Sequence, residues 1–501
     1  LDETVYVPSS AMNQVFALVV GRVGLHPVAV AGTTTAGLGP SGVSPTQSAL
    51  NSPPRAALDI DGNLYITDTG NDRTLITGIF DPPIITANPL YMVVAPGSTA
   101  TFVASASGNW PPTQLWNTSI DGGMTWTSLG VTTPSFTTAA AVYSDDGTLY
   151  RATFTSFGGS VTTVAAKLRV QLIYSFTPGS QAGTATALAL DSGNNLFVSD
   201  TAASCIRRFD YLTGAMTVAV GKCGFPGSSG DNGPATVATI GQVMGLAFDS
   251  NDNLYLSDAL YHTVRKVAKS TGIITLIVGM PGVNGTTDNM SGRFARLNGP
   301  QGLALDNQNN LYIADTQNCA VRLFLSGSSY VNAVIGSIGN CSDTGDGSYG
   351  AWASLHYPQS VAIDPTNGDQ VITQASSGVR RVSEATGYIS TIDTSITSPF
   401  DVTVDTYGTV FVSSMAANQV YAIPPGGPAA PVAGTGAASI GVDGISPSAS
   451  DSAQPIGIKI DSSQNMFVAA SAASRVRVAG RFTSPIVVLQ PLPQTVNAPG
   501  T

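Results

Sequence analysis

The sequence predicts an all-β protein made of repeated units, and two features of the 501-residue chain lead to this prediction. Residues 297–336 contain four short apolar runs separated by clusters of Asp, Asn, Gly and Ser, which is the pattern of four strands joined by turns. Similar stretches recur along the chain. Because one four-stranded meander of about 40 residues cannot bury both of its faces, its copies must pack on one another, and radial packing gives a β-propeller.

The most constant part of the unit is an Asp, a polar turn, an apolar strand with Tyr or Phe, and often a second Asp. Clear copies begin at Asp59, Asp191, Asp249 and Asp306, and weaker ones at Asp364, Asp405 and Asp461. The second Asp stands at Asp68, Asp200, Asp258 and Asp315. Because this repetition follows the fold, we interpret these carboxylates as caps of the following turns, the alternative being a shared Ca²⁺ site.

Residues 229–279, SGDNGPATVATIGQVMGLAFDSNDNLYLSDALYHTVRKVAKSTGIITLIVG, resemble a bacterial NHL-repeat blade together with the loop that precedes it. The resemblance implies a β-propeller, commonly of six blades, and implies no single activity.

The order of the units predicts where the propeller begins and ends. We predict a six-bladed propeller over residues 173–482, in which strand 173–178 supplies the fourth strand that the last unit lacks. Closure of the ring in this way removes open sheet edges. Residues 1–81 then form the last blades of a preceding propeller. The alternative is an eight-bladed ring made from all the units, with residues 82–172 as an insertion.

Residues 82–172 break the repeat and resemble a bacterial immunoglobulin-like β-sandwich. Trp116 stands in its central strand and Tyr150 at the tyrosine-corner position, although no Cys pair crosses the sheets. The C-terminal sequence FTSPIVVLQPLPQTVNAPGT echoes FDPPIITANPLYMVVAPGST near residue 80. We therefore expect residues 483–501 to be the first strand of a next Ig-like domain, so that the chain holds slightly more than one period of a tandem repeat.

The blade pattern pairs the four cysteines. Cys205 opens the third strand of one blade and Cys223 follows its fourth, while Cys319 and Cys341 occupy the equivalent places two blades later. Consecutive antiparallel strands bring such positions together, which predicts the disulfides Cys205–Cys223 and Cys319–Cys341 rather than four free thiols. Disulfides indicate an oxidising compartment, so we expect a secreted or cell-surface protein.

Composition narrows the range of functions. Charged residues make up only 10% of the chain and the net charge is −10, which argues against nucleic acid as a partner. Stretches long and apolar enough to span a membrane do not occur. His26, His262 and His356 fall at different positions of their units and no metal-ligand spacing is found. We therefore expect no catalytic, cofactor-binding or metal-binding residues, and no enzyme.

Two aromatic residues are the candidate binding residues. Tyr349 and Trp352 lie in the Gly-rich loop 341–352, where exposed rings on a propeller face could bind sugar or a neighbouring domain. The remaining observations favour a structural protein of the cell surface, a fibre, filament or adhesin stalk. Its modules would associate head to tail or continue in the same chain. The alternatives are a carbohydrate- or peptide-binding propeller, with surface glycans as partners, and an NHL-type lyase-like enzyme.

Overall fold

The computed structural model describes residues 5–480 apart from 22–23, 39–43, 60–62, 78–80, 109–110, 177–183, 211–214, 376–377 and 440. The described residues form β-strands and short 3₁₀ helices, so the prediction of an all-β protein is confirmed. Within this part of the chain no helix has the length and apolarity needed to cross a membrane. The strand predicted at 483–501 lies outside the described residues.

The chain divides into two compact units. The first contains residues 1–87, 105–115 and 152–163, and the second contains residues 88–104, 116–151 and 164–501. These units do not follow the predicted boundaries of 1–81 and 82–172, which stay predictions. The 3₁₀ helices of the described chain are η1 (Pro45–Gln47), η2 (Thr69–Asn71), η3 (Tyr143–Asp145), η4 (Ala235–Val237), η5 (Thr316–Asn318), η6 (Gly350–Trp352), η7 (Pro447–Ala449) and η8 (Ser471–Ala473).

The first unit is built from short antiparallel sheets. Its strands are β1 (Val5–Ser9), β2 (Gln14–Gly21), β3 (Gly24–Ala31), β4 (Ala56–Leu58), β5 (Leu64–Asp68), β6 (Arg73–Thr77), β7 (Ile84–Ala87), β10 (Ser105–Ser107) and β15 (Gly159–Thr162). Strands β1–β3 and β4–β6 form two three-stranded sheets. Val15, Ala31, Leu50, Leu64 and Ile66 pack into one core between them, as alternating apolar residues on strands predict.

The N-terminal part of the second unit consists of short strands that surround a core of aromatic side chains. Its strands are β8 (Met92–Val94), β9 (Thr101–Val103), β12 (Thr127–Ser128), β13 (Ser135–Thr137) and β16 (Ala166–Val170), while β11 (Thr113–Ser119) and β14 (Leu149–Ser156) cross the division. Trp116 is fully buried, and its indole Nε1 donates to the carbonyl of Thr133 at 3.0 Å. The ring of Phe136 lies 6.2 Å from that of Trp116 and 5.4 Å from that of Tyr150.

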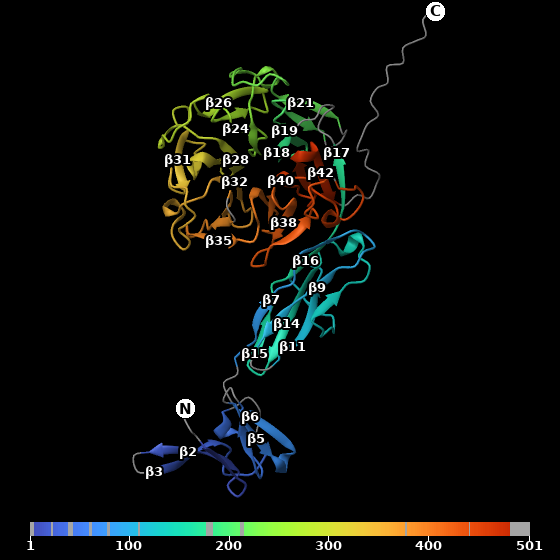
Figure 1. The fold of residues 1–501 in the computed structure, drawn as a ribbon, viewed down its shortest axis with the longest axis vertical. Coiled ribbons are helices and arrows are strands. Elements are labelled where there is room, and N and C mark those ends of the chain that lie inside the picture. Colours follow the sequence, from blue (N-terminus) through green and yellow to red (C-terminus); the bar gives the residue numbers. More distant parts are fainter. Residues whose placement is uncertain are drawn as a thin grey trace, which may run out of the picture. The chain divides into compact units, whose positions relative to one another are not determined.

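The rest of the second unit contains six sheets arranged in succession along the chain (Figure 1). Their strands, sheet by sheet, are β18 (Ala185–Leu190), β19 (Leu196–Asp200), β20 (Cys205–Phe209) and β21 (Met216–Val220); β22 (Gly233–Pro234), β23 (Val243–Phe248), β24 (Leu254–Asp258), β25 (Thr263–Val267) and β26 (Ile273–Gly279); β27 (Met290–Ser291), β28 (Pro300–Leu305), β29 (Leu311–Asp315), β30 (Ala320–Phe324) and β31 (Tyr330–Ile335); β32 (Pro358–Ile363), β33 (Gln370–Gln374), β34 (Val379–Val382) and β35 (Ile389–Asp393); β36 (Pro399–Val404), β37 (Val410–Ser414), β38 (Gln419–Ile423) and β39 (Ala430–Ala433); and β40 (Pro455–Ile460), β41 (Met466–Ala470), β42 (Arg475–Gly480) and β17 (Leu172–Phe176).

These six sheets form a closed, propeller-like ring. The two-residue strands β22 and β27 are additional strands, and the four longer strands of each sheet are counted as first to fourth across the sheet, starting from β18, β23, β28, β32, β36 or β40. These six first strands contact one another in that order, and β40 contacts β18. The last sheet takes its outer strand from the beginning of the unit, because β17 pairs antiparallel with β42 from Leu172↔Gly480 to Phe176↔Val476. Strand β17 thus joins the two ends of the ring.

Hydroxyl groups join four of the six sheets to the next one along the chain. A Ser or Thr on the second strand of a sheet donates to a carbonyl on the first strand of the following sheet. The pairs are Ser199 with Val243 at 2.8 Å, Ser257 with Gln301 at 2.5 Å, Thr373 with Phe400 at 2.6 Å and Ser413 with Ile456 at 2.7 Å. Because these hydroxyls are buried or nearly so, each bond also satisfies a polar group that water cannot reach.

Buried arginines fix the loops between the sheets. Arg265, Arg322, Arg380 and Arg477 lie on the third strands of four sheets and are at most 1% exposed. Each binds an Asp in the loop that precedes its own sheet, and the pairs are Arg265 with Asp231 at 3.0 Å, Arg322 with Asp288 at 2.8 Å, Arg380 with Asp346 at 2.6 Å and Arg477 with Asp443 at 3.4 Å. A buried guanidinium needs such partners because its desolvation is otherwise uncompensated.

Both predicted disulfides are confirmed. Cys205 is bonded to Cys223 and Cys319 to Cys341, with Cα atoms 5.0 and 5.1 Å apart. Each bond links the start of a third strand to the loop that follows the fourth strand of the same sheet, as the blade register predicted. In the described part of the chain no cysteine is free.

Replacing Arg322 by Met should lower the free energy of unfolding by about 3–5 kcal/mol, because it leaves the fully buried Asp315 carboxylate, 3.1 Å from Arg322 Nη1, without its cation. The matched control is Arg208→Met, whose pair with Asp210 is 32% and 25% exposed and should cost no more than about 1 kcal/mol. Guanidinium unfolding followed by circular dichroism measures both changes. Equal losses in the two variants would contradict the role given to the buried arginines.

Removing the second disulfide by Cys319→Ala with Cys341→Ala should lower the free energy of unfolding by about 3 kcal/mol, because the bond closes a loop with a sequence separation of 22 residues. Peptide mapping without reduction should first identify the bond in the unaltered protein. The unfolding midpoint of the unaltered protein should fall in reducing buffer, and an unchanged midpoint would count against the assigned role.

Candidate binding site

Three exposed aromatic rings gather on the outer side of the fourth sheet. Tyr349, Trp352 and Tyr388 are 44%, 74% and 48% exposed. The ring centroid of Tyr349 lies 4.9 Å from that of Trp352 and 4.8 Å from that of Tyr388, in edge-to-face arrangements. Such contacts stabilise the rings relative to one another. We define these three residues as the aromatic cluster.

The aromatic cluster is held by backbone pairing between two segments. Gly347 N donates to the carbonyl of Ile389, Ile389 N to that of Ser348, and Gly350 N to that of Gly387, each at 2.9 Å. The segment that carries Tyr349 thereby adds to the edge of β35, and Tyr349 and Tyr388 form a β-bridge. Loop 336–357 is thus fixed along its length by the sheet beside it.

Ion pairs and hydrogen bonds of side chains also hold the loop 336–357 in place. Arg380 binds the carboxylates of Asp343 at 2.5 Å and Asp346 at 2.6 Å. Asp343 also accepts a hydrogen bond from Gln374 Nε2 at 3.1 Å, and Asp346 accepts one from Thr391 N at 3.1 Å. One buried guanidinium therefore holds two carboxylates of the loop that bears Tyr349 and Trp352.

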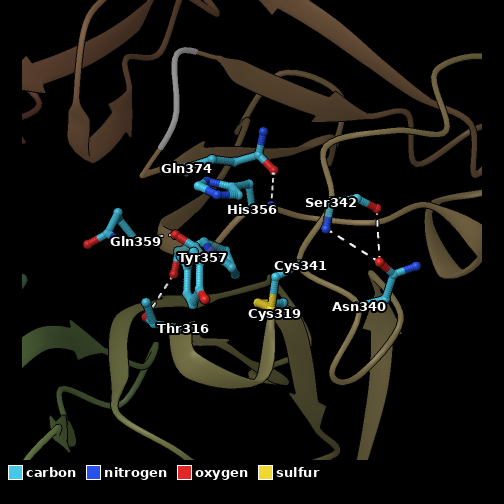
Figure 2. Close-up of a disulfide and its surroundings, with 10 residues drawn as sticks. Thr316, Cys319, Asn340, Cys341, Ser342, His356, Tyr357, Gln359 and Gln374 are labelled. Carbon is cyan, nitrogen blue, oxygen red and sulfur yellow. Dashed lines mark hydrogen bonds between the residues drawn. A yellow bond between two sulfur atoms is a disulfide. The ribbon is translucent and has the colours of Figure 1, made fainter.

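The two ends of the loop are anchored as well. Figure 2 shows that Cys341, near the start of the loop, is bonded to Cys319 on the preceding sheet. Near the end of the loop, the backbone N–H of His356 donates to Gln374 Oε1 at 2.8 Å. An ordered loop with rings facing solvent is preorganised for binding, since little conformational entropy is lost when a ligand docks.

The equivalent loops show that the site is a variation on a repeated scaffold. Counting from the Asp that each arginine binds, the position of Trp352 corresponds to Val237 and Phe294, and both of these are 63% exposed. The position of Tyr349 corresponds to Pro234 and Ser291. The outward position is therefore built into every long loop, whereas the described loop 336–357 alone combines it with two neighbouring tyrosines.

A pocket of about 270 Å³ opens beside the aromatic cluster. It lies between the third and fourth sheets, and its walls include Tyr312, Tyr349, Gln370 and Glu384. Burial, together with the carboxylates of Asp306 and Glu384, raises the pKa of Tyr312 to about 12. The Tyr312 hydroxyl is therefore protonated at neutral pH and available as a hydrogen-bond donor.

The repeated second Asp residues act on the backbone, in agreement with the interpretation as turn caps. Asp258 accepts hydrogen bonds from Gly241 N at 2.6 Å and Tyr261 N at 3.1 Å, and Asp315 accepts one from Asn298 N at 2.7 Å. Burial raises the pKa of Asp258 although these bonds oppose it. Among the described residues no group of three or more His, Cys, Asp or Glu side chains could hold a metal ion.

The histidines belong to separate places. His262 follows the second strand of the second sheet, and its Nδ1 accepts a hydrogen bond from Gly299 N at 3.0 Å. His356 precedes the fourth sheet, and its ring lies 5.0 Å from that of Tyr357. The side chain of His26 lies outside the described part. The two described histidine rings thus contact different partners.

Sequence reasoning found Tyr349 and Trp352 but missed Tyr388, Arg380 and Glu384. Tyr388 lies 39 residues beyond Tyr349 and meets it only because loop 336–357 pairs with the segment at β35. A signal for Arg380 was present, because Arg265, Arg322 and Arg477 stand at the same place in their units. An arginine repeated on apolar strands of a chain with few charges indicates a structural partner.

A protein-family model described as NHL repeat matches residues 297–324. Endoglucanase C of Cellulomonas fimi is 35% identical over 107 residues, which amount to 21% of this chain and 9% of that protein, so the chain spans under a tenth of this relative. A protein of unknown function from Bacteroides thetaiotaomicron aligns with 80% of this chain and 98% of its own, at 14% identity and a TM-score of 0.48. Virginiamycin B lyase from Staphylococcus aureus aligns with 62% and 100%, at 12% identity and a TM-score of 0.43. The NHL match supports the propeller part of the predicted resemblance, whereas the Ig-like part stays a prediction.

Replacing Arg380 by Met should release the loop of the aromatic cluster. Without the guanidinium, Asp343 and Asp346 lose their cation, and the amides of Gly347 and Gly350 should exchange with deuterium at least about tenfold faster. The control is Arg265→Met, which frees Asp231 in another loop and should leave these amides protected. Hydrogen exchange with mass spectrometry measures both, and the assignment fails if loop 336–357 is equally protected in all three proteins.

Proposed function

We propose that this protein is an extracellular binding module that recognises carbohydrate through the aromatic cluster of Tyr349, Trp352 and Tyr388. The observation that carries the proposal is that the exposed ring of Tyr349 contacts those of Trp352 and Tyr388, and that an arginine, a disulfide and a sheet edge hold the loop of Tyr349 and Trp352 in place. A sugar ring presents an apolar C–H face that stacks on an aromatic ring, while its hydroxyls remain in water. Fixed, exposed aromatic groups suit this kind of ligand.

The composition supports a neutral ligand. Charged residues are only 10% of the chain, so stacking and hydrogen bonding, rather than ion pairing, are the interactions that its surface offers. The stretch similar to Endoglucanase C, an enzyme named for acting on glucan, also supports a polysaccharide as the partner. Binding of a peptide at the same rings is the alternative, because aromatic side chains also anchor peptides.

The scaffold that we propose for the site is a six-bladed propeller over residues 173–482, closed by strand 173–178. The six successive sheets and the pairing of β17 with β42 support this blade count over the alternative of eight. We further propose that residues 82–172 are an Ig-like sandwich. The buried Trp116 supports the sandwich.

We propose binding rather than catalysis at the cell surface. The two disulfides support an oxidising compartment.

A head-to-tail fibre or adhesin stalk is the second candidate. The observation in its favour is the internal duplication, in which residues near 80–99 are echoed near 482–501. Such a repeat places propeller and sandwich modules alternately, either in one chain or through self-association, and gives an open array. Carbohydrate binding by each module would then attach the array to surface glycans.

Replacing Trp352 by Ala should weaken binding to neutral polysaccharide by about 30-fold, close to 2 kcal/mol, because Trp352 is the most exposed ring of the aromatic cluster and offers the largest stacking surface. Phe294→Ala is the matched control, since Phe294 occupies the equivalent position of the preceding long loop, where Tyr330 corresponds to Tyr388 but Ser291 stands in place of Tyr349. Pull-down on insoluble β-glucan and xylan, with calorimetry on soluble fragments, measures the affinities. The proposal is wrong if the two variants bind alike.

A further inference from the structure

The pocket beside the aromatic cluster has room for one ring of a ligand. Its volume of about 270 Å³ lies just below the range of roughly 300–1,000 Å³ that is usual for drug-sized ligands. Apolar side chains of Leu323, Val334 and Val382 form part of its wall. A pocket of this size between two sheets accepts a terminal sugar residue more readily than the middle of a chain.

Two polar groups on the wall of the pocket, the exposed Glu384 and the half-buried Tyr312, complement adjacent sugar hydroxyls. Glu384 supplies a carboxylate whose Oε2 accepts a hydrogen bond from Gln370 Nε2 at 2.8 Å. Tyr312 supplies a hydroxyl donor. In the neighbouring sheet the equivalent Tyr255 hydroxyl donates to Asp249 at 3.2 Å, whereas the structure records no such partner for Tyr312 among the described residues. The Tyr312 hydroxyl is therefore free to bind a ligand.

The charge of the pocket is negative. The described residues place no Lys, Arg or His within ion-pair distance of Glu384, while the nearby Arg381 is engaged by Asp364 at 3.1 Å and Asp369 at 3.2 Å. A carboxylate on the ligand would approach Glu384 without a cation to offset the repulsion. Sugar hydroxyls, by contrast, can donate to it in a charge-assisted hydrogen bond.

Building on the carbohydrate-binding function proposed above, we infer that this pocket holds the terminal residue of a neutral glycan chain. Tyr349 both lines the pocket and touches Trp352 and Tyr388, so the following sugar residues lie on the aromatic cluster. Glu384 and Tyr312 bind hydroxyls of the terminal residue, and Glu384 rejects glycans that end in an acidic sugar. The aromatic cluster supplies affinity, and the pocket supplies selection for the chain end and its charge.

Calorimetry with matched oligosaccharides tests this inference. The neutral probes are the hexasaccharides cellohexaose, laminarihexaose and xylohexaose. The acidic probes are oxidised forms of the two glucose oligomers, cellohexaose and laminarihexaose. Each of these two is prepared in two forms, one with a carboxylate at the reducing-end residue and one with a carboxylate at the non-reducing-end residue. We expect the best neutral glucose oligomer to bind at least about tenfold more tightly than one of its two oxidised forms. Glu384→Gln should narrow this gap at least about threefold, because the amide keeps the shape of the side chain and removes its charge.

A second pair of variants separates binding from folding. Tyr312→Phe should weaken the neutral glucose oligomer at least about threefold, and Tyr255→Phe, which removes the equivalent hydroxyl from a sheet that lacks the aromatic cluster, should leave its affinity unchanged. The pocket assignment is wrong if neutral and oxidised forms bind with equal affinity, or if Glu384→Gln leaves the ratio of their affinities unchanged. If binding still depends on Trp352 in that case, the proposed function stands without the pocket. Absence of binding to all neutral glycans overturns both.

Discussion

A buried guanidinium that binds an aspartate of the preceding loop is the interaction on which the long loops of the ring depend. In a chain with so few charges, Arg265, Arg322, Arg380 and Arg477 are almost wholly buried, and each has a carboxylate partner. The loops are rich in Gly and polar residues and have little apolar surface of their own to bury. Because a buried guanidinium binds carboxylates with strict geometry, it fixes the loop where hydrophobic packing cannot, even though each aspartate is partly exposed.

The ring itself depends on a different set of contacts. Its sheets pack through apolar faces, and hydroxyls such as Ser199 and Ser413 join the second strand of one sheet to the first strand of the next. Strand β17 precedes all the other strands of the ring in the sequence and pairs with β42 in the last sheet. Backbone hydrogen bonds therefore join the beginning and the end of the ring-forming segment. Closure brings the first and last sheets into contact through β18 and β40, so the outer surface and its loops can vary without opening the ring.

The fold could be predicted from the sequence to a greater extent than the site. Period-two apolar runs and turn residues are local signals, and the regular repeat turned them into a register that correctly paired Cys205 with Cys223 and Cys319 with Cys341. Tyr349 and Trp352 could be found because aromatic residues in a Gly-rich loop are unusual. Tyr388 and Glu384 join them only through pairing with β35 and packing between two sheets, and these contacts follow from three-dimensional structure rather than from spacing along the chain.

Repetition also explains how a binding site can arise without a change of fold. The outward position held by Val237, Phe294 and Trp352 is presented by the same arginine-bound turn in each loop, so its side chain is free to differ while the backbone is fixed. One substitution there yields an exposed ring, and a tyrosine on the loop with another on the adjoining strand yields a surface for stacking. Specificity then requires only a few polar groups in the space between two sheets, where Glu384 lies without a cation. In this arrangement the ligand is bound by loop residues, and the loop is held in place by other groups, the buried arginines and their aspartates, which do not contact the ligand.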